Sequence, residues 1–313
     1  MKKALLAVAA AMFTAGCMEV VVDETTVFAP VAFDAALAQQ THELVSGEGG
    51  FGAADRWSAA WDNRVQRGLL AAPAPAFVVS TIEHGRLTGQ AGLAWSMVSR
   101  EGPNRPLVVR CGGNASTRQK TGFVYTVTAI DHGDVLLFDY PGSGETGGVV
   151  TTARFEEMRS ELVSFVREKA AGRQLVLWGH SLGGFVCSSL AELLPETAGV
   201  ILETTARNAA EVAKAWTPWY AGPFVHIKIK EGLKAYDNTN SLKGFKGPVL
   251  VLGAAQDKTL PVQLARSMNR ALEDLGVDVQ YVEFRDGGHS DLPGQPGFAD
   301  AISAFFNRLA PAA

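Results

Sequence analysis

Apolar and amphipathic segments alternate along most of this chain. Eight short apolar runs predict strands, at 77–82, 92–98, 106–111, 134–140, 174–179, 199–203, 248–253 and 279–284. Several are continuous apolar runs, which is typical of strands covered on both faces. Longer segments predict helices at 118–130, 151–172, 182–194, 261–276 and 297–310. The alternation predicts an α/β fold, with a mostly parallel eight-stranded sheet, helices on both faces and an antiparallel lead-in formed by the first two strands.

Residues 206–246 interrupt this alternation with a long insertion between two predicted strands. A compact domain rarely carries so long a connection without a function, and such insertions are often lids. Its aromatic residues Trp216, Trp219, Tyr220 and Phe224 could line an apolar substrate pocket or pack within the insertion itself.

Two segments precede the main domain, which we place at 76–313. The first, 1–16, has the pattern of a signal peptide, with Lys2 and Lys3 followed by an apolar stretch too short to span a bilayer. The rest, 17–75, contains a tether or edge strand, a helical segment at 33–68 and a linker at 71–76. In the helical segment Trp57 and Trp61 are four residues apart and would share one face.

The end of the signal sequence, Thr14-Ala15-Gly16-Cys17, resembles a bacterial lipobox, although Thr14 stands where leucine is usual. The resemblance implies cleavage before Cys17 and lipidation of its thiol, so that acyl chains hold the protein at a membrane without spanning it. Met18 after the cysteine would suit the outer membrane, in an organism that has one. The alternative is an ordinary secretory signal and a periplasmic or secreted protein.

Composition narrows the possible partners. Of 313 residues, 47% are hydrophobic and 19% charged, and the net charge of −4 comes without a basic cluster, so we expect no nucleic-acid partner. Besides Cys17 only Cys111 and Cys187 remain, too few for a disulfide framework. We expect two buried free thiols that behave as small hydrophobic side chains.

The stretch LWGHSLGG at 177–184 carries the strongest chemical signal. Gly179, Ser181 and Gly183 form a G-x-S-x-G pattern between a predicted strand and a predicted helix. A nucleophile on such a sharp turn has a strained backbone, and side chains two residues away on either side would collide with neighbouring elements. The pattern predicts that Ser181 is a nucleophile rather than only a helix cap, with His180 orienting the turn.

A nucleophilic serine needs a base, and the base needs an acid to orient it. His289 lies on a glycine-rich loop directly after the last predicted strand and is the expected base. Asp257 follows another strand at the same edge of the sheet and is the expected acid, although it could merely cap the next helix. Glu203 is the alternative acid, while Asp286 and Asp291 are too close to His289 in sequence to point back at its ring.

The tetrahedral intermediate of acyl transfer also needs hydrogen-bond donors. One expected donor is the backbone N–H of Leu182, directly after the nucleophile. The second should come from the loop Arg110–Arg118, where the backbone of Gly113 or Asn114 can turn inward.

Residues 75–310 resemble serine hydrolases of the α/β-hydrolase superfamily. The resemblance rests on GHSLGG, on the positions of Asp257 and His289, and on FDYPGSGETGG at 138–148, which is similar to that superfamily's D-x-x-G-x-G-x-S loop with Thr146 in place of serine. Cys111 stands where many members have histidine at the start of the oxyanion loop.

These observations predict a lipid-anchored serine hydrolase of the cell envelope that cleaves carboxylic esters through an acyl-enzyme. Its partners would be a small or lipid-like acyl substrate and a membrane, with no metal or organic cofactor. An acyltransferase, thioesterase or peptidase could use the same triad, since fold and triad do not fix the substrate. The remaining alternative is an inactive surface-anchored binding protein. Such proteins commonly lose the serine or the histidine of the triad, whereas this sequence retains both. The sequence leaves the physiological substrate and the oligomeric state open.

Overall fold

We describe residues 18–46, 59–60, 62–71, 81–218, 220 and 225–310 of the computed structural model. The signal segment with Cys17, Trp57, Trp61 and the linker at 72–76 lie outside these residues.

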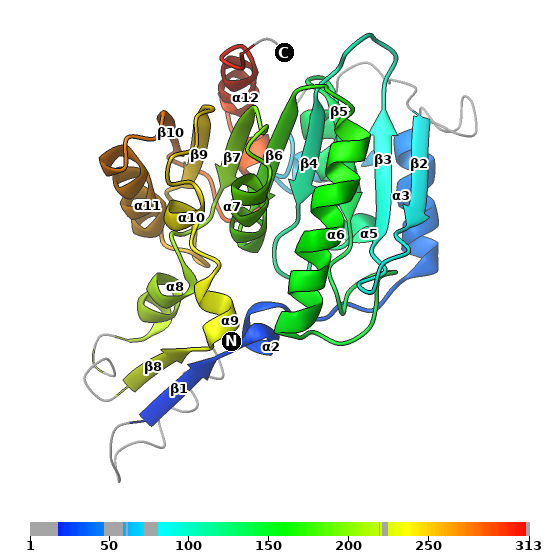
Figure 1. The fold of residues 1–313 in the computed structure, drawn as a ribbon. Coiled ribbons are helices and arrows are strands. Elements are labelled where there is room, and N and C mark those ends of the chain that lie inside the picture. Colours follow the sequence, from blue (N-terminus) through cyan, green and yellow to red (C-terminus); the bar gives the residue numbers. More distant parts are fainter. Residues whose placement is uncertain are drawn as a thin grey trace.

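A large sheet of eight strands forms the centre of the molecule, in the order β10-β9-β7-β6-β4-β5-β3-β2 (Figure 1). Its strands are β2 (Thr81–Arg86), β3 (Ala94–Ser99), β4 (Leu107–Cys111), β5 (Asp134–Phe138), β6 (Leu175–His180), β7 (Gly199–Glu203), β9 (Val249–Ala254) and β10 (Val279–Phe284). All neighbours are parallel except at β3, which is antiparallel to both β2 and β5. The predicted sheet is therefore confirmed, including its antiparallel lead-in.

Several strand boundaries differ from the prediction by one or two residues, and the end of the first strand differs by four. The first strand was expected to end at residue 82 but extends to Arg86, because it pairs with β3 from Thr81↔Ser99 to Arg86↔Ala94. The hairpin closes one residue later, where the N–H of Leu87 donates to the carbonyl of Leu93 at 2.9 Å. Backbone pairing with β3 outweighs the weak strand preference of this polar segment.

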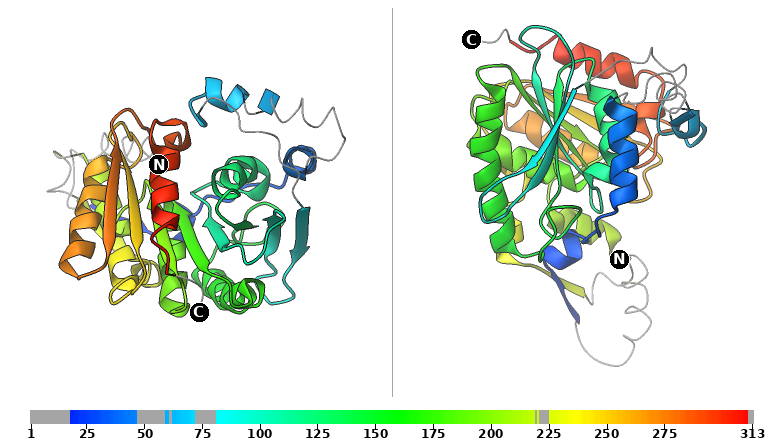
Figure 2. Two further views of the ribbon diagram at one scale, coloured as in Figure 1. Left: turned by 90° about the horizontal axis from the view of Figure 1, so that it is seen from above. Right: turned by 90° about the vertical axis from the view of Figure 1, so that its right-hand side faces the viewer.

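Helices cover both faces of the sheet, as the end-on view of Figure 2 shows. One face carries α6 (Thr152–Ala170), α7 (Leu182–Leu193) and α11 (Val262–Asp274), and the other carries α3 (Ala35–Ser46), α5 (Arg118–Ala129) and α12 (Phe298–Phe306). Each face has its own buried core: Phe155 and Met268 pack on one side, and Phe123 and Phe305 on the other. Strands buried between two cores explain the continuous apolar runs of the sequence.

The insertion contains α8 (Ala209–Trp216), β8 (Val225–Ile229), α9 (Glu231–Lys234) and α10 (Asn238–Ser241). Strand β8 pairs in parallel with β1 (Met18–Val22), from the other end of the chain, and this two-stranded sheet projects beside the main domain (Figure 1). The short helix α2 (Glu24–Val27) then leads back to the main domain, and η2 (Leu292–Gly294) precedes α12. Within the described ranges no helix is long and apolar enough to cross a membrane.

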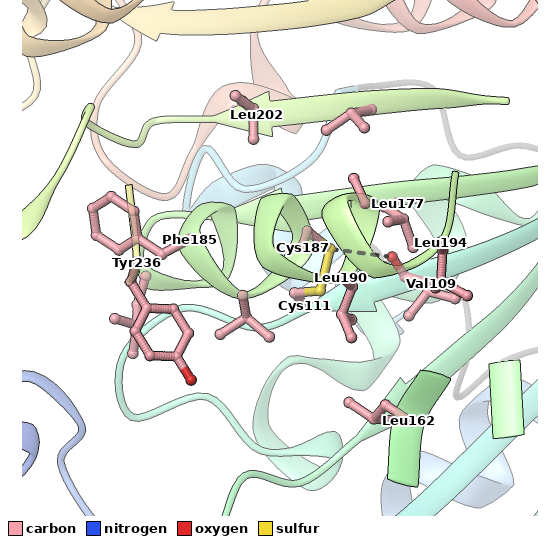
Figure 3. Packing of buried hydrophobic residues seen from close by; sticks show 14 of the residues in the cluster. Val109, Cys111, Leu162, Leu177, Phe185, Cys187, Leu190, Leu194, Leu202 and Tyr236 are labelled. Atoms are coloured by element: carbon pink, nitrogen blue, oxygen red, sulfur yellow. Dashed lines mark hydrogen bonds between the residues drawn. A yellow bond between two sulfur atoms is a disulfide. The ribbon is translucent and has the colours of Figure 1, made fainter. Parts of the chain in front are cut away.

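The two internal cysteines form a disulfide, contrary to the expectation of free thiols. Cys111 ends β4, Cys187 lies in α7, and their Cα atoms are 5.9 Å apart. Both sulfurs lie within the core between the sheet and α7, among side chains such as Leu177 and Leu190 (Figure 3). The pairing follows from topology: β4 lies beside β6, and α7 starts directly after β6 and packs back across both. Seventy-six residues separate the two cysteines, so sequence distance gave no indication of it.

Candidate active site

Ser181 occupies the sharp turn between β6 and α7. Its backbone has φ 53° and ψ −119°, a conformation that costs a residue with a side chain energy and is typical of functional sites. Hydrogen bonds fix the turn: the N–H of Ser181 donates to the carbonyl of Glu203 at 2.8 Å, and that of Gly184 donates to Ser181 at 3.0 Å. A Cβ atom at Gly179 would collide with the backbone of Gly183, and one at Gly183 with the carbonyl of Cys111. The glycines are therefore required by close backbone packing.

The structure brings Ser181, His289 and Asp257 into one hydrogen-bonded row. The Oγ of Ser181 lies 2.9 Å from Nε2 of His289, whose Nδ1 lies 2.7 Å from Oδ2 of Asp257. The other carboxylate oxygen of Asp257 accepts the N–H groups of Thr259 and Leu260 at 2.7 and 2.8 Å. These bonds fix the carboxylate, and the carboxylate fixes the imidazole with Nε2 directed at the serine. Such an arrangement can remove the proton from a hydroxyl nucleophile.

The alternative acids have other partners. Glu203 is buried beneath the turn, where it accepts the indole N–H of Trp178 at 2.8 Å and lies 3.5 Å from the guanidinium of Arg110. Asp291 accepts the N–H of Gly288 within its own loop.

The second oxyanion donor can be chosen from the hydrogen bonds of the loop after β4. The N–H of Gly113 is directed at the hydroxyl oxygen of Tyr125, 3.3 Å away. The side chain of Asn114 is occupied as well, because its Oδ1 accepts the N–H of Ala29 at 2.7 Å. Among the described residues, no acceptor is bound to the backbone N–H of Asn114 or of Leu182. Of the two residues that the sequence left open, Asn114 is thus the better donor, together with Leu182.

Hydrogen bonds through the buried residues Tyr125 and His180 connect the loop after β4 with the loop of His289. The hydroxyl of Tyr125 lies 3.2 Å from Nδ1 of His180, and Nε2 of His180 lies 2.9 Å from the carbonyl oxygen of His289. Burial lowers the pKa of His180 and favours its neutral ring, although Glu203 opposes the shift. A neutral ring with its proton on Nε2 satisfies both hydrogen bonds. The hydroxyl of Tyr125 donates to Nδ1, and Nε2–H donates to the carbonyl oxygen of His289. His180, the residue before Ser181, thereby positions the backbone of His289.

A cavity of about 620 Å³ lies beside Ser181 and His289. Ser181 and His289 form part of its wall, and most of the remaining wall is apolar. The apolar side chains come from α7, the Asp257 loop, the insertion and the N-terminal segment. They include Val20, Val22, Val27, Leu182, Phe185, Val212, Trp216, Ile227 and Leu260. Arg67 and Lys120 also line the cavity. A wall of this kind suits a ligand with a large apolar part.

A family model described as "alpha/beta hydrolase fold" matches residues 106–226. An esterase from Pyrococcus furiosus aligns with 76% of this chain and 97% of its own, at a TM-score of 0.57 and 14% identity. An acylaminoacyl peptidase from Pyrococcus horikoshii aligns with 74% of this chain and 42% of its own, also at 0.57, with 15% identity. The chain has the α/β-hydrolase fold.

Two relatives by sequence are each less than 30% identical to this chain. The chain is 27% identical over 209 residues to lysophosphatidylserine lipase ABHD12 of Rattus norvegicus. The aligned region covers 60% of this chain and 51% of that protein. It is 28% identical over 245 residues to an uncharacterized protein of Mycobacterium tuberculosis, covering 74% of this chain and 79% of the other. The chain spans about half the length of the lipase relatives it matches.

Within this α/β-hydrolase fold, the aromatic residues of the insertion have different positions. Trp216 lines the cavity, and its indole N–H donates to the carbonyl of Thr259 at 2.6 Å, which joins α8 to the loop of Asp257. Tyr220 is about half exposed and is not part of the cavity wall. Trp219 and Phe224 lie outside the described residues.

Sequence reasoning missed Tyr125 and Arg110, and of the tether or edge strand that it expected after Cys17 the structure shows a strand, β1. Arg110 lies beneath the turn, with its guanidinium between the rings of Tyr125 and Trp178 at 4.4 and 3.9 Å from their centroids. Burial lowers its pKa and the neighbouring Glu203 opposes the shift. A lone arginine in a predicted strand gave the only signal, since buried arginines are rare unless paired. In the described part of the chain, no group of three or more His, Cys, Asp or Glu side chains could hold a metal ion.

Proposed function

We propose that the protein is a serine hydrolase that cleaves carboxylic esters with an apolar acyl part. The hydrogen-bonded row Ser181–His289–Asp257, with Ser181 and His289 in the wall of an apolar cavity, is the observation that carries the proposal. Similarity to lysophosphatidylserine lipases supports it, because those proteins are lipases by name.

The geometry suits acylation of the serine. Oγ of Ser181 attacks the ester carbonyl while Nε2 of His289 takes its proton, and Asp257 stabilises the imidazolium that results. The N–H groups of Leu182 and Asn114 donate to the oxyanion, and a single donor of this kind contributes about 10²–10³ in kcat. His289 then protonates the leaving alcohol.

Deacylation follows by the same groups. The neutral His289 removes a proton from a water molecule that attacks the acyl-enzyme, and collapse of the second tetrahedral intermediate returns the proton from His289 to Ser181. A carboxylic acid leaves, and every group returns to its starting state.

A fluorophosphonate probe tests the nucleophile without knowledge of the natural substrate. We expect it to label the parent protein and not the Ser181→Ala variant, and we expect His289→Ala to lower hydrolysis of a p-nitrophenyl ester by at least about 10⁴-fold. Ser290→Ala is a matched control, because Ser290 also lines the cavity, whereas the hydroxyl that lies 2.9 Å from Nε2 of His289 belongs to Ser181. A folded parent that neither labels nor hydrolyses esters would refute the proposal and favour a binding protein.

We also propose that Cys17 is lipidated and that the protein acts at the cell envelope, on the basis of the lipobox-like sequence before it. The expected result is that the protein sediments with membranes when expressed in bacteria, whereas Cys17→Ser moves it to the soluble fraction. The Ser181→Ala variant should remain with the membranes. If Cys17→Ser and the parent fractionate alike, the anchor is not at Cys17.

A further inference from the structure

Strand β1 places the N-terminal residues in contact with the insertion. In its parallel pairing with β8, Val20 is opposite Ile227 and Val22 is opposite Ile229. Side chains alternate along a strand, so Val20 and Val22 share one face and Val21 lies on the other. Exposure agrees with this alternation, since Val22 is 7% exposed and Val21 is 49% exposed.

The face with Val20 and Val22 forms part of the catalytic cavity. Both residues, with Ile227 from β8, line the same cavity as Ser181 and His289. Strand β1 is therefore part of the wall of the proposed active site, although about 160 residues of sequence separate Val20 from Ser181.

Several contacts hold this wall in place. The N–H of Lys230 donates to the carbonyl of Val22 at 2.9 Å and extends the pairing with the insertion. The ammonium of Lys230 lies 2.8 Å from the carboxylate of Glu24, which also accepts the N–H of Thr152 at 3.2 Å. The ring of Phe28 is buried against Phe155, with centroids 3.8 Å apart. These bonds tie β1 to both the insertion and the main domain, which a loose tether would not require.

We propose that β1 is the wall that accommodates the acyl chain, so that the N-terminal strand selects for esters of long, apolar acyl chains. The inference deepens the ester hydrolysis proposed above and depends on it. Phe185, Val212 and Trp216 continue the apolar surface around the strand. Each methylene group that leaves water for such a surface contributes to binding, so the length of chain that fits decides which ester reacts fastest.

The position of β1 also connects this selection with the expected lipid anchor. The strand starts at Met18, directly after Cys17, and its five residues span about 17 Å. An anchor on Cys17 would therefore hold the acyl-binding wall near a membrane, where esters of long acyl chains reside.

Two neighbouring valines provide the test. Val20→Trp fills the cavity, and Val21→Trp places the same ring on the opposite face of the same strand. The assay compares kcat/KM for acetyl, octanoyl and dodecanoyl p-nitrophenyl esters. We expect Val20→Trp to lower the octanoyl-to-acetyl ratio by at least about tenfold, as the loss of room for a few methylene groups predicts, and Val21→Trp to leave it within about twofold of the parent.

Val20→Ala is a second variant that enlarges the cavity and should raise the dodecanoyl-to-octanoyl ratio. The inference is overturned if Val20→Trp and Val20→Ala leave both ratios unchanged, or if Val21→Trp alters them as much as Val20→Trp does. A parent without activity on any ester, including the acetyl ester that needs no acyl wall, would instead refute the proposed function.

Discussion

The disulfide between Cys111 and Cys187 should contribute a large part of the free energy of unfolding. It closes a loop across 76 residues of sequence. The loss of chain entropy in the unfolded state for a loop of that size corresponds to about 4.5 kcal/mol at 25 °C. For a chain of this length each kcal/mol raises Tm by about 2 °C, so the disulfide should raise Tm by roughly 10 °C.

Equilibrium unfolding in urea, with and without dithiothreitol, measures this contribution. Both sulfurs are inaccessible to solvent in the folded protein, so the reductant acts on the unfolded chain and removes its constraint there. We expect the urea midpoint to fall in the presence of dithiothreitol without any change to the folded core. The Cys111→Ala/Cys187→Ala double variant is the control, and its midpoint should not respond to the reductant.

Two results would refute this reasoning. Thiol titration of the denatured, unreduced protein should find neither Cys111 nor Cys187 free, and two reactive thiols would show that the bond does not form. If the bond does form and the midpoint still does not respond to dithiothreitol, loop closure does not stabilise this protein.

Three further predictions concern the loops around the site and the support of β1. Asn114→Pro, which removes the proposed oxyanion N–H, should lower kcat by about 10²–10³, whereas Asn114→Ala keeps that N–H and should retain most activity. Tyr125→Phe leaves the N–H of Gly113 and a ring nitrogen of His180 without their partner, so urea unfolding should show a loss of about 1–3 kcal/mol. Burial raises the pKa of Glu24, but hydrogen bonds, first that from Lys230, outweigh burial and hold the pKa below its ordinary value. This contribution to stability is present above the ordinary carboxyl pKa and is lost as the pH falls through the lowered value. The Tm of the parent should therefore differ from that of Glu24→Gln at neutral pH, and the two Tm values should converge in acid.

The sequence by itself determined the main domain. Continuous apolar runs are required wherever strands are buried between two layers of helices. This pattern placed all eight strands of the large sheet, with boundaries shifted by up to four residues. The glycines around Ser181 were informative because only glycine fits where the turn packs against the backbone of Gly183 and Cys111. The positions of Asp257 and His289 after their strands also followed from local order, since parallel strands end at one edge of the sheet.

Only the tertiary structure decided which distant segments of the chain contact each other. The local pattern of residues 18–22 does not identify β8 as their partner, because a short apolar strand can pair with any exposed strand edge. The choice of Asn114 over Gly113 as donor required the hydroxyl of Tyr125, which helix α5 brings to the N–H of Gly113. The disulfide likewise depends on helix α7 packing back across β4. Local propensity acts over a few residues, whereas these contacts arise only when the folded chain brings remote segments together.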